Sequence, residues 1–408
     1  MAAPERTTVA VVGGGPAGMM LGLLLARQGI DVAVLEKHGD FLRDFRGDTV
    51  HPSTMDLLDQ LGLGEKFKQI PQGKFQRLGL REDMQLGSIA ELKLKHPYIA
   101  IAPQWDFLNL LAGEARGYPA FHLLMRSEAF AALRDGDRVV GVRYRDETGQ
   151  EKELRAQLTV GADGRHSNIR ESVGLPTHNF GAPFDVLWFR LSKPDPGKEE
   201  FYFKVVPYRW VVGFDRRTYI QIAYIIPKGA RDEVQRAGID QFRSRLAEAM
   251  PEVADRVHEL TSFDDIKFLE VQVNRAPRWH LPGLLLIGDS AHAMSPMGGV
   301  GVNYAIQDAV AASNILSGPL KEIQHTGDEV PERLLSAVQR RRWLPTAVIQ
   351  LLQRVAQQRL VEPALHGKVS AVPKFAKIMQ QIGPLRRLFL RVLVVGVRQE
   401  RIDTTPRR

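Results

Sequence analysis

The sequence predicts an α/β fold with a core of alternating strands and helices, a β-rich insertion and a helical C-terminal region. Three observations predict it. Residues 8–12, 17–28 and 31–35 have the pattern of a buried strand, a helix with apolar spacing and a second buried strand. Residues 180–273 are rich in short β-branched and aromatic runs. Residues after 332 return to helical spacing.

The other elements of the first half follow from local spacing and from Gly and Pro at their ends. Residues 52–61 form a predicted helix that Pro52 opens and Gly62 closes, and residues 105–116 form another. Two pairs of strands are predicted, at 77–94 around a turn at 82–84 and at 139–160 around a turn at 147–150.

The second half predicts an antiparallel layer followed by helices. Strands are expected at 186–191, 201–206, 210–214, 219–226 and 284–287, helices at 231–250, from about Gly301 and after Glu332, and a loose linker at 317–331. A β-rich insertion of this length suits a substrate-binding layer on an α/β core. No internal repeat interrupts this order.

Length and composition narrow the class of protein. The chain has 408 residues, enough for two or three domains at about 150 residues each. Its 44% hydrophobic and 25% charged residues are typical of a folded protein and exclude disordered and collagen-like chains. It has no cysteine, which excludes disulfides, thiolate metal sites and iron–sulfur clusters and fits a reducing compartment. We therefore expect a cytoplasmic protein without a metal site.

The positive charge is concentrated at the C-terminal end. Residues 361–408 hold a local charge of +7 out of a net +8, which argues against a nucleic-acid groove across the fold. In that segment Arg386, Arg387 and Arg391 alternate with apolar residues at 388–390 and 392–395. This pattern fits either a solvated surface or weak peripheral contact with an anionic membrane. Both remain open.

The apolar stretch at residues 9–26 resembles the core of a signal peptide. It lacks a cationic leader, and three glycines and a proline interrupt it, so we interpret it as part of the fold. No other stretch reaches the roughly 18 apolar residues that a membrane-spanning helix needs.

A glycine-rich turn lies between the first predicted strand and helix. Gly13, Gly15 and Gly18 fit the pattern G-x-G-x-x-G, which allows a tight turn, a close backbone approach to a pyrophosphate and close helix packing. Glu36 ends the second strand, where its carboxylate can accept hydrogen bonds from ribose hydroxyls. These residues predict a Rossmann-like dinucleotide-binding domain.

Two further segments complete a recognisable set. Residues 160–167 (Val-Gly-Ala-Asp-Gly-Arg-His-Ser) and 286–292 (Leu-Ile-Gly-Asp-Ser-Ala-His) each follow a predicted strand. With the glycine-rich turn, in this order, they resemble the class A flavoprotein monooxygenases, the family of p-hydroxybenzoate hydroxylase. The resemblance covers about the first 320 residues. It implies bound FAD, and NADH or NADPH as a transient electron donor.

The resemblance also implies which residues contact the cofactor. The first motif would bind the ADP half of FAD, Asp163 and Gly164 would serve FAD and the nicotinamide cofactor, and Asp289 would bind the ribitol. Asp289 could instead cap the next helix, and Asn303, expected at the flavin ring, could instead be a helix-surface residue. The expected cofactor-binding residues are Gly13, Gly15, Pro16, Ala17, Gly18, Glu36, Lys37, Arg46, Gln104, Asp163, Gly164, Gly288, Asp289, Pro296, Gly299, Gly301, Val302 and Asn303.

The domain boundaries follow from these motifs. We expect a discontinuous FAD-binding domain at 1–72, 98–180 and 275–330, a β-rich substrate domain at 73–97 and 181–274, and a helical region at 331–408. There is no second glycine-rich dinucleotide fingerprint. The nicotinamide cofactor would therefore have no Rossmann domain of its own.

The sequence says less about the residues that contact the substrate and about the reacting groups. Candidates for positioning the substrate are Arg190, Trp210, Pro296 and Gly298. Arg190 could bind an acidic or phenolate substrate or pair with a carboxylate at the layer's edge. No general base can be named, and His51, His166 and His292 are interpreted as cofactor-shell or surface residues.

The predicted function is an FAD-dependent NAD(P)H:oxygen oxidoreductase. The resemblance implies hydroxylation, through a flavin hydroperoxide, of a hydrophobic phenolic, quinolone or polyketide-like aromatic. The partners are then the small aromatic substrate and dioxygen. The alternatives are a flavin-dependent reductase of the geranylgeranyl-reductase type and a non-catalytic FAD-binding shielding protein.

Overall fold

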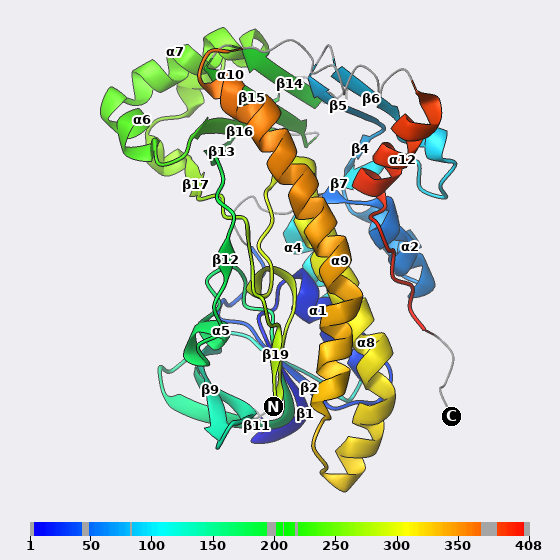
Figure 1. Ribbon diagram of the computed structural model, residues 1–408. Helices are drawn as coiled ribbons and strands as arrows, with labels where there is room; N and C mark the ends of the chain where they lie inside the picture. The colour runs from blue at the N-terminus through cyan, green and yellow to red at the C-terminus, as the bar shows by residue number, and fades with distance from the viewer. Residues whose placement is uncertain are drawn as a thin grey trace.

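The computed structural model describes residues 4–42, 49–81, 84–193, 201–206, 208–216, 219–368 and 382–403. Its elements form two large sheets and three small ones with helices around them, so the predicted α/β class is confirmed (Figure 1). A long helix lies alongside both sheets.

The central sheet has eight strands. Its main path is β19-β20-β11-β1-β2-β8, with β10 and β9 extending from β11. β1 runs parallel to β11 and β2, as the opening strand–helix–strand unit predicts. The strands are β1 (Arg6–Val12), β2 (Val32–Leu35), β8 (Phe121–Leu124), β9 (Glu128–Asp135), β10 (Arg138–Arg145), β11 (Glu151–Gly161), β19 (His280–Leu281) and β20 (Leu284–Leu286).

Three helices cover one face of the central sheet and form the largest core. α1 (Pro16–Ala26) packs against α4 (Gln104–Ala115) and α8 (Gly301–Thr326). Residues 17–26 of α1 are all buried, which explains why this stretch is apolar on every side. The resemblance of residues 9–26 to a signal peptide therefore reflects a buried strand and a buried helix.

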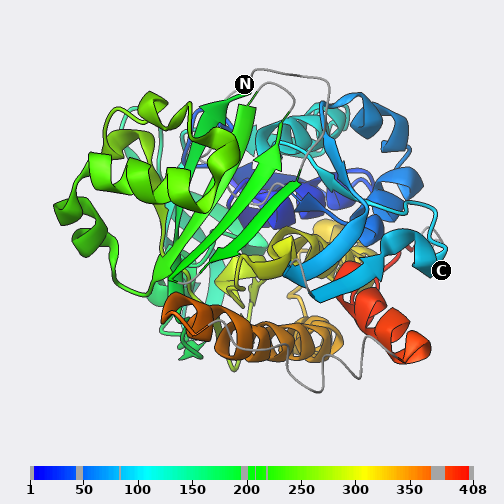
Figure 2. The ribbon, with the colours of Figure 1, turned by 90° about the horizontal axis from the view of Figure 1, so that it is seen from above.

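The second sheet is antiparallel, in the order β14-β15-β16-β13-β17. In β13, Leu187, Phe189 and Leu191 pack against α7 (Ile239–Ala249), while Val186 and Trp188 face the opposite side. Figure 2 shows α6 (Arg231–Ala237) and α7 on one side of this sheet. Its strands are β13 (Phe184–Ser192), β14 (Phe201–Val206), β15 (Arg209–Asp215), β16 (Tyr219–Pro227) and β17 (Lys267–Leu269).

Smaller elements complete the molecule. Strands β3 (Thr49–Val50), β7 (Ile99–Ile101) and β4 (Gly73–Phe75) form one small sheet, and β5 (Arg77–Arg81) with β6 (Met84–Ser88) and β12 (His178–Asn179) with β18 (Asn274–Arg275) form two more. The shorter helices are α2 (Pro52–Gln60), α3 (Gly64–Gln69), α5 (Asn168–Ser172), α10 (Glu362–Leu365) and α12 (Gly383–Val394), with a π turn at Gln357–Val361 and short 3₁₀ turns.

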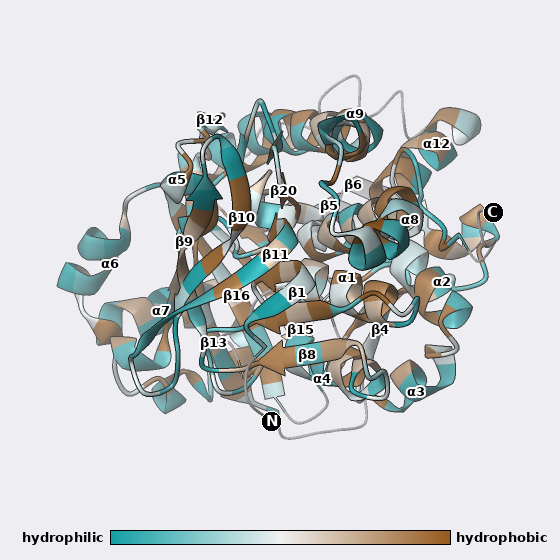
Figure 3. Cartoon of the chain, turned by 90° about the horizontal axis from the view of Figure 1, so that it is seen from below, coloured by the Kyte–Doolittle hydropathy of each residue, from teal (hydrophilic) through white to brown (hydrophobic). Residues whose placement is uncertain are grey.

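Helix α9 (Glu332–Ala356) lies alongside both sheets. It packs against α8 and β19, and the π turn and α10 that follow it reach β15 and β16 (Figure 1). Among the described helices, none is both long and apolar enough to cross a bilayer. Figure 3 shows β8, whose sequence Phe-His-Leu-Leu is mostly apolar, in brown, whereas α6, which has no buried residue, is mostly teal.

Two expectations about elements were wrong. The linker expected at 317–331 is mostly helix, because α8 continues to Thr326 with Ser317, Leu320 and Ile323 buried in the core despite Pro319. The helix expected at 231–250 is two helices, because Gly238 adopts a φ of +89° between α6 and α7. Strands β8 and β9 were not predicted.

Candidate active site

The glycine-rich turn joins β1 to α1 as its motif requires. Gly13 has a φ of +105°, and a Cβ there would lie 2.4 Å from the Ala162 carbonyl oxygen. A Cβ at Gly18 would lie 1.9 Å from the Gly13 oxygen, whereas at Gly15 no atom lies within 4 Å. The turn is thus packed on the protein side and open at the start of α1, which fits a pyrophosphate. The other motif residues, Pro16 and Ala17, begin α1.

Glu36 lies beside this turn, at the end of β2. It is 1% exposed, and its carboxylate accepts hydrogen bonds from the Gly14 amide at 2.8 Å and the His38 amide at 3.0 Å. The carboxylate therefore also fixes the turn itself. Lys37 is exposed at the same strand end, and Arg46 lies outside the described residues.

Asp163 and Gly164 follow β11, next to the turn. One carboxylate oxygen of Asp163 accepts from the Ile169 amide at 3.1 Å. The other is buried and has no hydrogen-bond partner among the described residues. Burial raises the pKa of Asp163. An unpaired buried acceptor at this position fits a donor on a bound ligand.

Gly288 and Asp289 follow β20 at the same edge of the sheet. The Asp289 side chain is 33% exposed and lies 3.8 Å from the guanidinium of Arg165. Asp289 lies inside the 3₁₀ turn at Gly288–Ser290, and no side chain caps this turn or the next helix, α8, so Asp289 caps neither. The Asp289 carboxylate can therefore reach a ligand at the carboxyl end of the strands.

The Pro296–Val302 segment turns its carbonyl groups toward the protein. Gln353 donates to the Met297 oxygen at 2.8 Å, and Thr49 donates to the Gly299 oxygen at 2.7 Å. Gly298 and Gly299 have φ of +79° and +62°. In a trans peptide the N–H points opposite to the C=O of the same peptide unit. The N–H groups of Gly298 and Val300 therefore point away from Gln353 and Thr49.

Helix α8 begins directly after this turn, with Gly301 and Val302 in its first turn. Helix N-termini carry unpaired amides and a partial positive charge. The segment therefore fits the electron-rich edge of a flavin ring.

Asn303 is buried and is not a helix-surface residue. Its amide oxygen accepts from the His51 amide at 2.9 Å and from Thr54 Oγ1 at 2.8 Å. Its amide nitrogen donates to the oxygens of Thr49 and Gly299, at 3.0 and 3.1 Å. The side chain thus joins β3 and α2 to the glycine turn, and a contact of Asn303 with the flavin would use its backbone.

The remaining candidates occupy separate places. Gln104 begins α4 and is half-buried. Trp210 is buried on the face of the antiparallel sheet opposite α7, and Arg190 is exposed with its guanidinium 6.0 Å from the Tyr219 ring. Neither Arg190 alternative is decided by this arrangement. His166 is exposed.

His51 lies between the glycine turn and helix α12. Its ring nitrogens are 3.1 Å from the Val394 oxygen and 3.2 Å from the Gly298 oxygen. Burial lowers the pKa of His51 to about 4. A neutral imidazole can donate to only one of the two carbonyls, so His51 is a positioning group at this turn.

Sequence reasoning missed a buried charge network behind Gly288. Asp308 accepts from the Gly288 amide at 3.0 Å, from His292 Nε2 at 2.6 Å and from Arg342 Nε at 2.9 Å. Arg342 also lies 3.4 Å from Glu400. These charges hold the pKa of Asp308 below its usual value although burial opposes the shift. The available signal was that Asp308 is the only charged residue between Gly301 and Leu320.

Comparison with protein families supports the same cofactor. A family model described as an FAD binding domain matches residues 6–351. The chain is 33% identical over 400 residues to the 6-methylpretetramide 4-monooxygenase of Streptomyces rimosus, covering 96% of this chain and 93% of that protein. It is 29% identical over 381 residues to a 12-dehydrotetracycline 5-monooxygenase/anhydrotetracycline 6-monooxygenase of Streptomyces rimosus subsp. rimosus, covering 88% and 70% of the two chains.

The fold is also similar to that of solved structures. The p-nitrophenol 4-monooxygenase of Pseudomonas putida DLL-E4 matches with a TM-score of 0.77 at 21% identity, over 97% of this chain and 100% of that one. At this identity the likeness concerns the fold alone.

Proposed function

Because this chain belongs to the FAD binding domain family, among its class A flavoprotein aromatic monooxygenases, we propose that it hydroxylates an oxygen-rich, polycyclic phenol of the polyketide type. Full-length similarity to an enzyme named for 6-methylpretetramide is the observation that carries the substrate class. A second relative is named for anhydrotetracycline. The monooxygenase assignment disfavours the reductase and shielding alternatives.

The bound cofactor would lie along the carboxyl ends of β1, β2, β11 and β20. Gly15 leaves room for the pyrophosphate, whereas Gly13 and Gly18 allow the close packing of the turn against the protein. Glu36 would bind the ribose, and Asp289 would bind the ribitol. FAD, reduced by NAD(P)H, supplies the activation of dioxygen and the transfer of one oxygen atom to the substrate. The protein must then bind the substrate, orient it and exclude water.

The inner face of the antiparallel sheet supplies an apolar wall for a planar substrate. Trp188 stacks on Phe214 with ring centroids 6.0 Å apart, and both belong to the cluster around Trp210. Met297, from the glycine turn, packs against the same cluster. This contact connects the proposed substrate wall to the proposed flavin turn. Aromatic rings of this kind stack on planar ligands.

The experiment is oxygen uptake by the purified flavoprotein. We expect a bound-flavin visible spectrum and NADH or NADPH oxidation that accelerates with tetracyclic phenols. Uptake of dioxygen should match product formation. A simple monocyclic phenol is the control substrate and should give slower turnover. NAD(P)H oxidation that produces only hydrogen peroxide with every polycyclic phenol tested would contradict the substrate class.

Peripheral membrane contact through the basic C-terminal end stays a prediction. In α12, Leu390 and Val394 are buried against Ile89 and Ile99, whereas Leu388 is 60% exposed. Only part of the apolar surface is therefore available to a membrane. Leu388→Asp should reduce binding to anionic vesicles, and unchanged sedimentation with such vesicles would remove the idea.

A further inference from the structure

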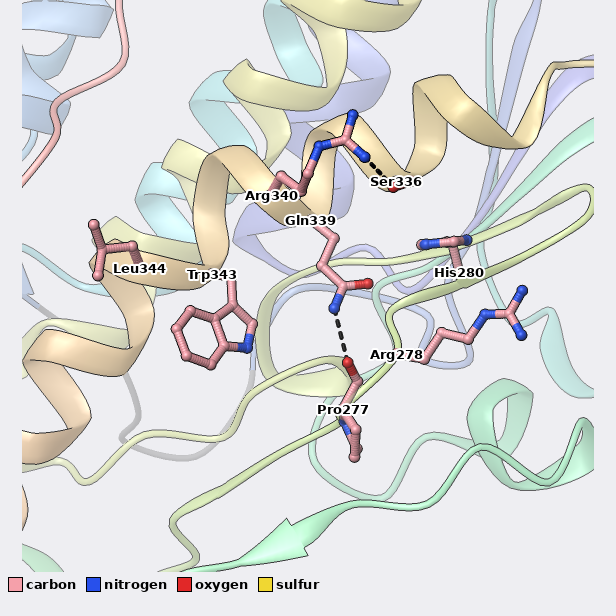
Figure 4. Close-up of a pocket in the computed structure, with 8 residues that line it drawn as sticks. All are labelled: Pro277, Arg278, His280, Ser336, Gln339, Arg340, Trp343 and Leu344. Carbon is pink, nitrogen blue, oxygen red and sulfur yellow. Dashed lines mark hydrogen bonds between the residues drawn. The ribbon is translucent and has the colours of Figure 1, made fainter.

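An open groove lies between helix α9 and the segment leading into β19 (Figure 4). Its volume is about 500 Å³. Trp343 is 41% exposed, and its indole points into the space between the two walls. The residues lining the groove are Pro277, Arg278, His280, Ser336, Gln339, Arg340, Trp343 and Leu344. The groove thus combines an exposed aromatic ring with basic side chains.

Two further arginines extend this surface along α9. The guanidinium of Arg275 lies 4.7 Å from the Trp343 ring and 5.4 Å from the Phe180 ring. The guanidinium of Arg354 lies 4.7 Å from the Phe180 ring, so the contacts follow the order Trp343, Arg275, Phe180, Arg354. We call these four residues the α9 strip.

The two arginines of the α9 strip have no counter-charge within the part of the chain that the structure describes. Neither guanidinium contacts a carboxylate among the described residues, and Arg354 Nε is buried without a hydrogen-bond partner. Burial and repulsion by Arg354 both lower the pKa of Arg275. Some other arginines do have carboxylate partners, as Arg341 has in Glu400. Nη1 of Arg275 donates to the side-chain oxygen of Gln350 at 3.2 Å. An anion beside the two guanidinium groups would relieve their repulsion and supply acceptors for their other N–H groups.

The α9 strip leads toward the proposed flavin turn. Gln353, next to Arg354, donates to the carbonyl oxygens of Ser295 and Met297. Along an α-helix, Trp343 and Gln353 are about 15 Å apart at 1.5 Å per residue. A ligand that begins in the groove and extends along the strip therefore approaches the redox site.

We propose that the groove and the α9 strip bind the ADP half of the nicotinamide dinucleotide. The adenine stacks on Trp343, and the diphosphate binds Arg275 and Arg354. The sequence has one dinucleotide fingerprint, which the FAD site uses, so a second dinucleotide needs a cradle of another kind. The inference requires only the use of NAD(P)H by the family and does not depend on the aromatic substrate.

The test is the binding of ADP and of 2′,5′-ADP to the FAD-loaded protein, followed by tryptophan fluorescence. We expect quenching in the wild type that is lost in Trp343→Phe. Arg275→Ala and Arg354→Gln should each weaken binding about tenfold, the loss of one charge-assisted contact. Arg236→Ala, at an exposed position of α6, is the matched control and should bind like the wild type.

Kinetics separates binding from a general loss of structure. In both strip variants the KM for NAD(P)H should rise, with the limiting rate of anaerobic flavin reduction and the flavin spectrum unchanged. Arg354→Gln keeps a helix-compatible residue, so it remains informative if Arg275→Ala does not fold. Affinities for ADP within twofold of wild type in a folded strip variant would overturn the proposal. So would equal affinity for inorganic phosphate and ADP, because it would remove the role of Trp343.

The assay contains neither dioxygen nor an aromatic substrate. A protein that binds ADP through the α9 strip yet hydroxylates no polyketide phenol would refute the proposed substrate and leave the strip intact. A protein that hydroxylates a polyketide phenol but does not bind ADP through the α9 strip would refute the proposed role of the strip alone.

Discussion

Asp308 is a fully buried carboxylate whose hydrogen bonds fix the backbone of the Gly288–Asp289 turn. It holds the Gly288 amide and also balances Arg342 and His292. Removing one member of a buried ion pair lowers the free energy of unfolding by more than the pair contributes to it, because the remaining charge is left buried and unpaired. The residue therefore acts on the cofactor through Gly288, and is a positioning residue.

We predict that Asp308→Ala lowers the free energy of unfolding by about 3–5 kcal/mol. It should also weaken FAD binding, measured by flavin fluorescence on dilution. Asp308→Asn keeps one acceptor for the Gly288 amide and should retain more FAD. Asp240→Ala, which removes an exposed partner of Arg243, is the control and should change little. Wild-type FAD affinity in a folded Asp308→Ala protein would contradict the positioning role.

Gly13 gives a second prediction at the scale of one residue. Gly13→Ala places a methyl group against the Ala162 carbonyl at a φ of +105°, so we expect loss of bound FAD. Gly113→Ala, in α4 with no atom within 4 Å of the new Cβ, should instead raise stability by up to about 1 kcal/mol. Flavin absorbance after gel filtration and chemical unfolding distinguish the two. Equal flavin content would be evidence against the pyrophosphate assignment.

His51 predicts a pH dependence of stability. Its pKa falls from 6.5 when unfolded to about 4 in the fold, so the unfolded chain binds more protons between these values. The stability contribution is fully present above pH 6.5 and is lost as the pH falls toward 4, on the order of 3 kcal/mol. The free energy of unfolding, measured with urea, should differ less between pH 7 and pH 4.5 for His51→Gln than for the wild type. Identical differences would mean that His51 does not titrate in this range.

At the scale of elements, α9 is attached to the flavin turn through Gln353. The side-chain amide supplies hydrogen bonds to two carbonyls, of Ser295 and Met297. Gln353→Ala should therefore cost about 1–3 kcal/mol in unfolding free energy and lower FAD affinity. Gln358→Ala, exposed in the π turn that follows, is the control. An unchanged flavin affinity in Gln353→Ala would show that the Pro296–Val302 segment keeps its conformation without Gln353.

Elements with strong local signals were predictable from sequence. β1, α1 and β2 form a run of buried apolar residues around a glycine turn, and the structure confirms them within two residues at each end. The end of α8 was not predictable, because Ser317 and Pro319 favour a loop and only the packing of Leu320 and Ile323 keeps the helix intact. Local propensity was overridden there by tertiary contacts.

The candidate site likewise contains residues that could be predicted from the sequence and residues that could not. The glycines and acidic residues that follow strands could be found from spacing, because their roles depend on the backbone at strand ends. Asp308 and His51 could not, because their partners lie far away in the sequence: Arg342 for Asp308, and Val394 for His51. Such contacts need the tertiary fold.

At the scale of the whole molecule, residues after 331 are tied to the cofactor-binding core. Arg342 pairs with Asp308 at 2.9 Å, and Gln350 donates to the oxygens of Asn274 and Ala293. We propose the discontinuous division given above, with FAD-binding segments 1–72, 98–180 and 275–330, a substrate layer at 73–97 and 181–274, and a C-terminal region at 331–408 that packs against the first.

We propose that this protein transfers one atom of dioxygen to a polycyclic phenol. Mass spectrometry of the product formed from NAD(P)H under ¹⁸O₂ tests it most directly. We expect a product that carries one ¹⁸O atom and is absent from a Gly13→Ala control lacking flavin. A product formed at the same rate without any ¹⁸O would rule out oxygen transfer from dioxygen.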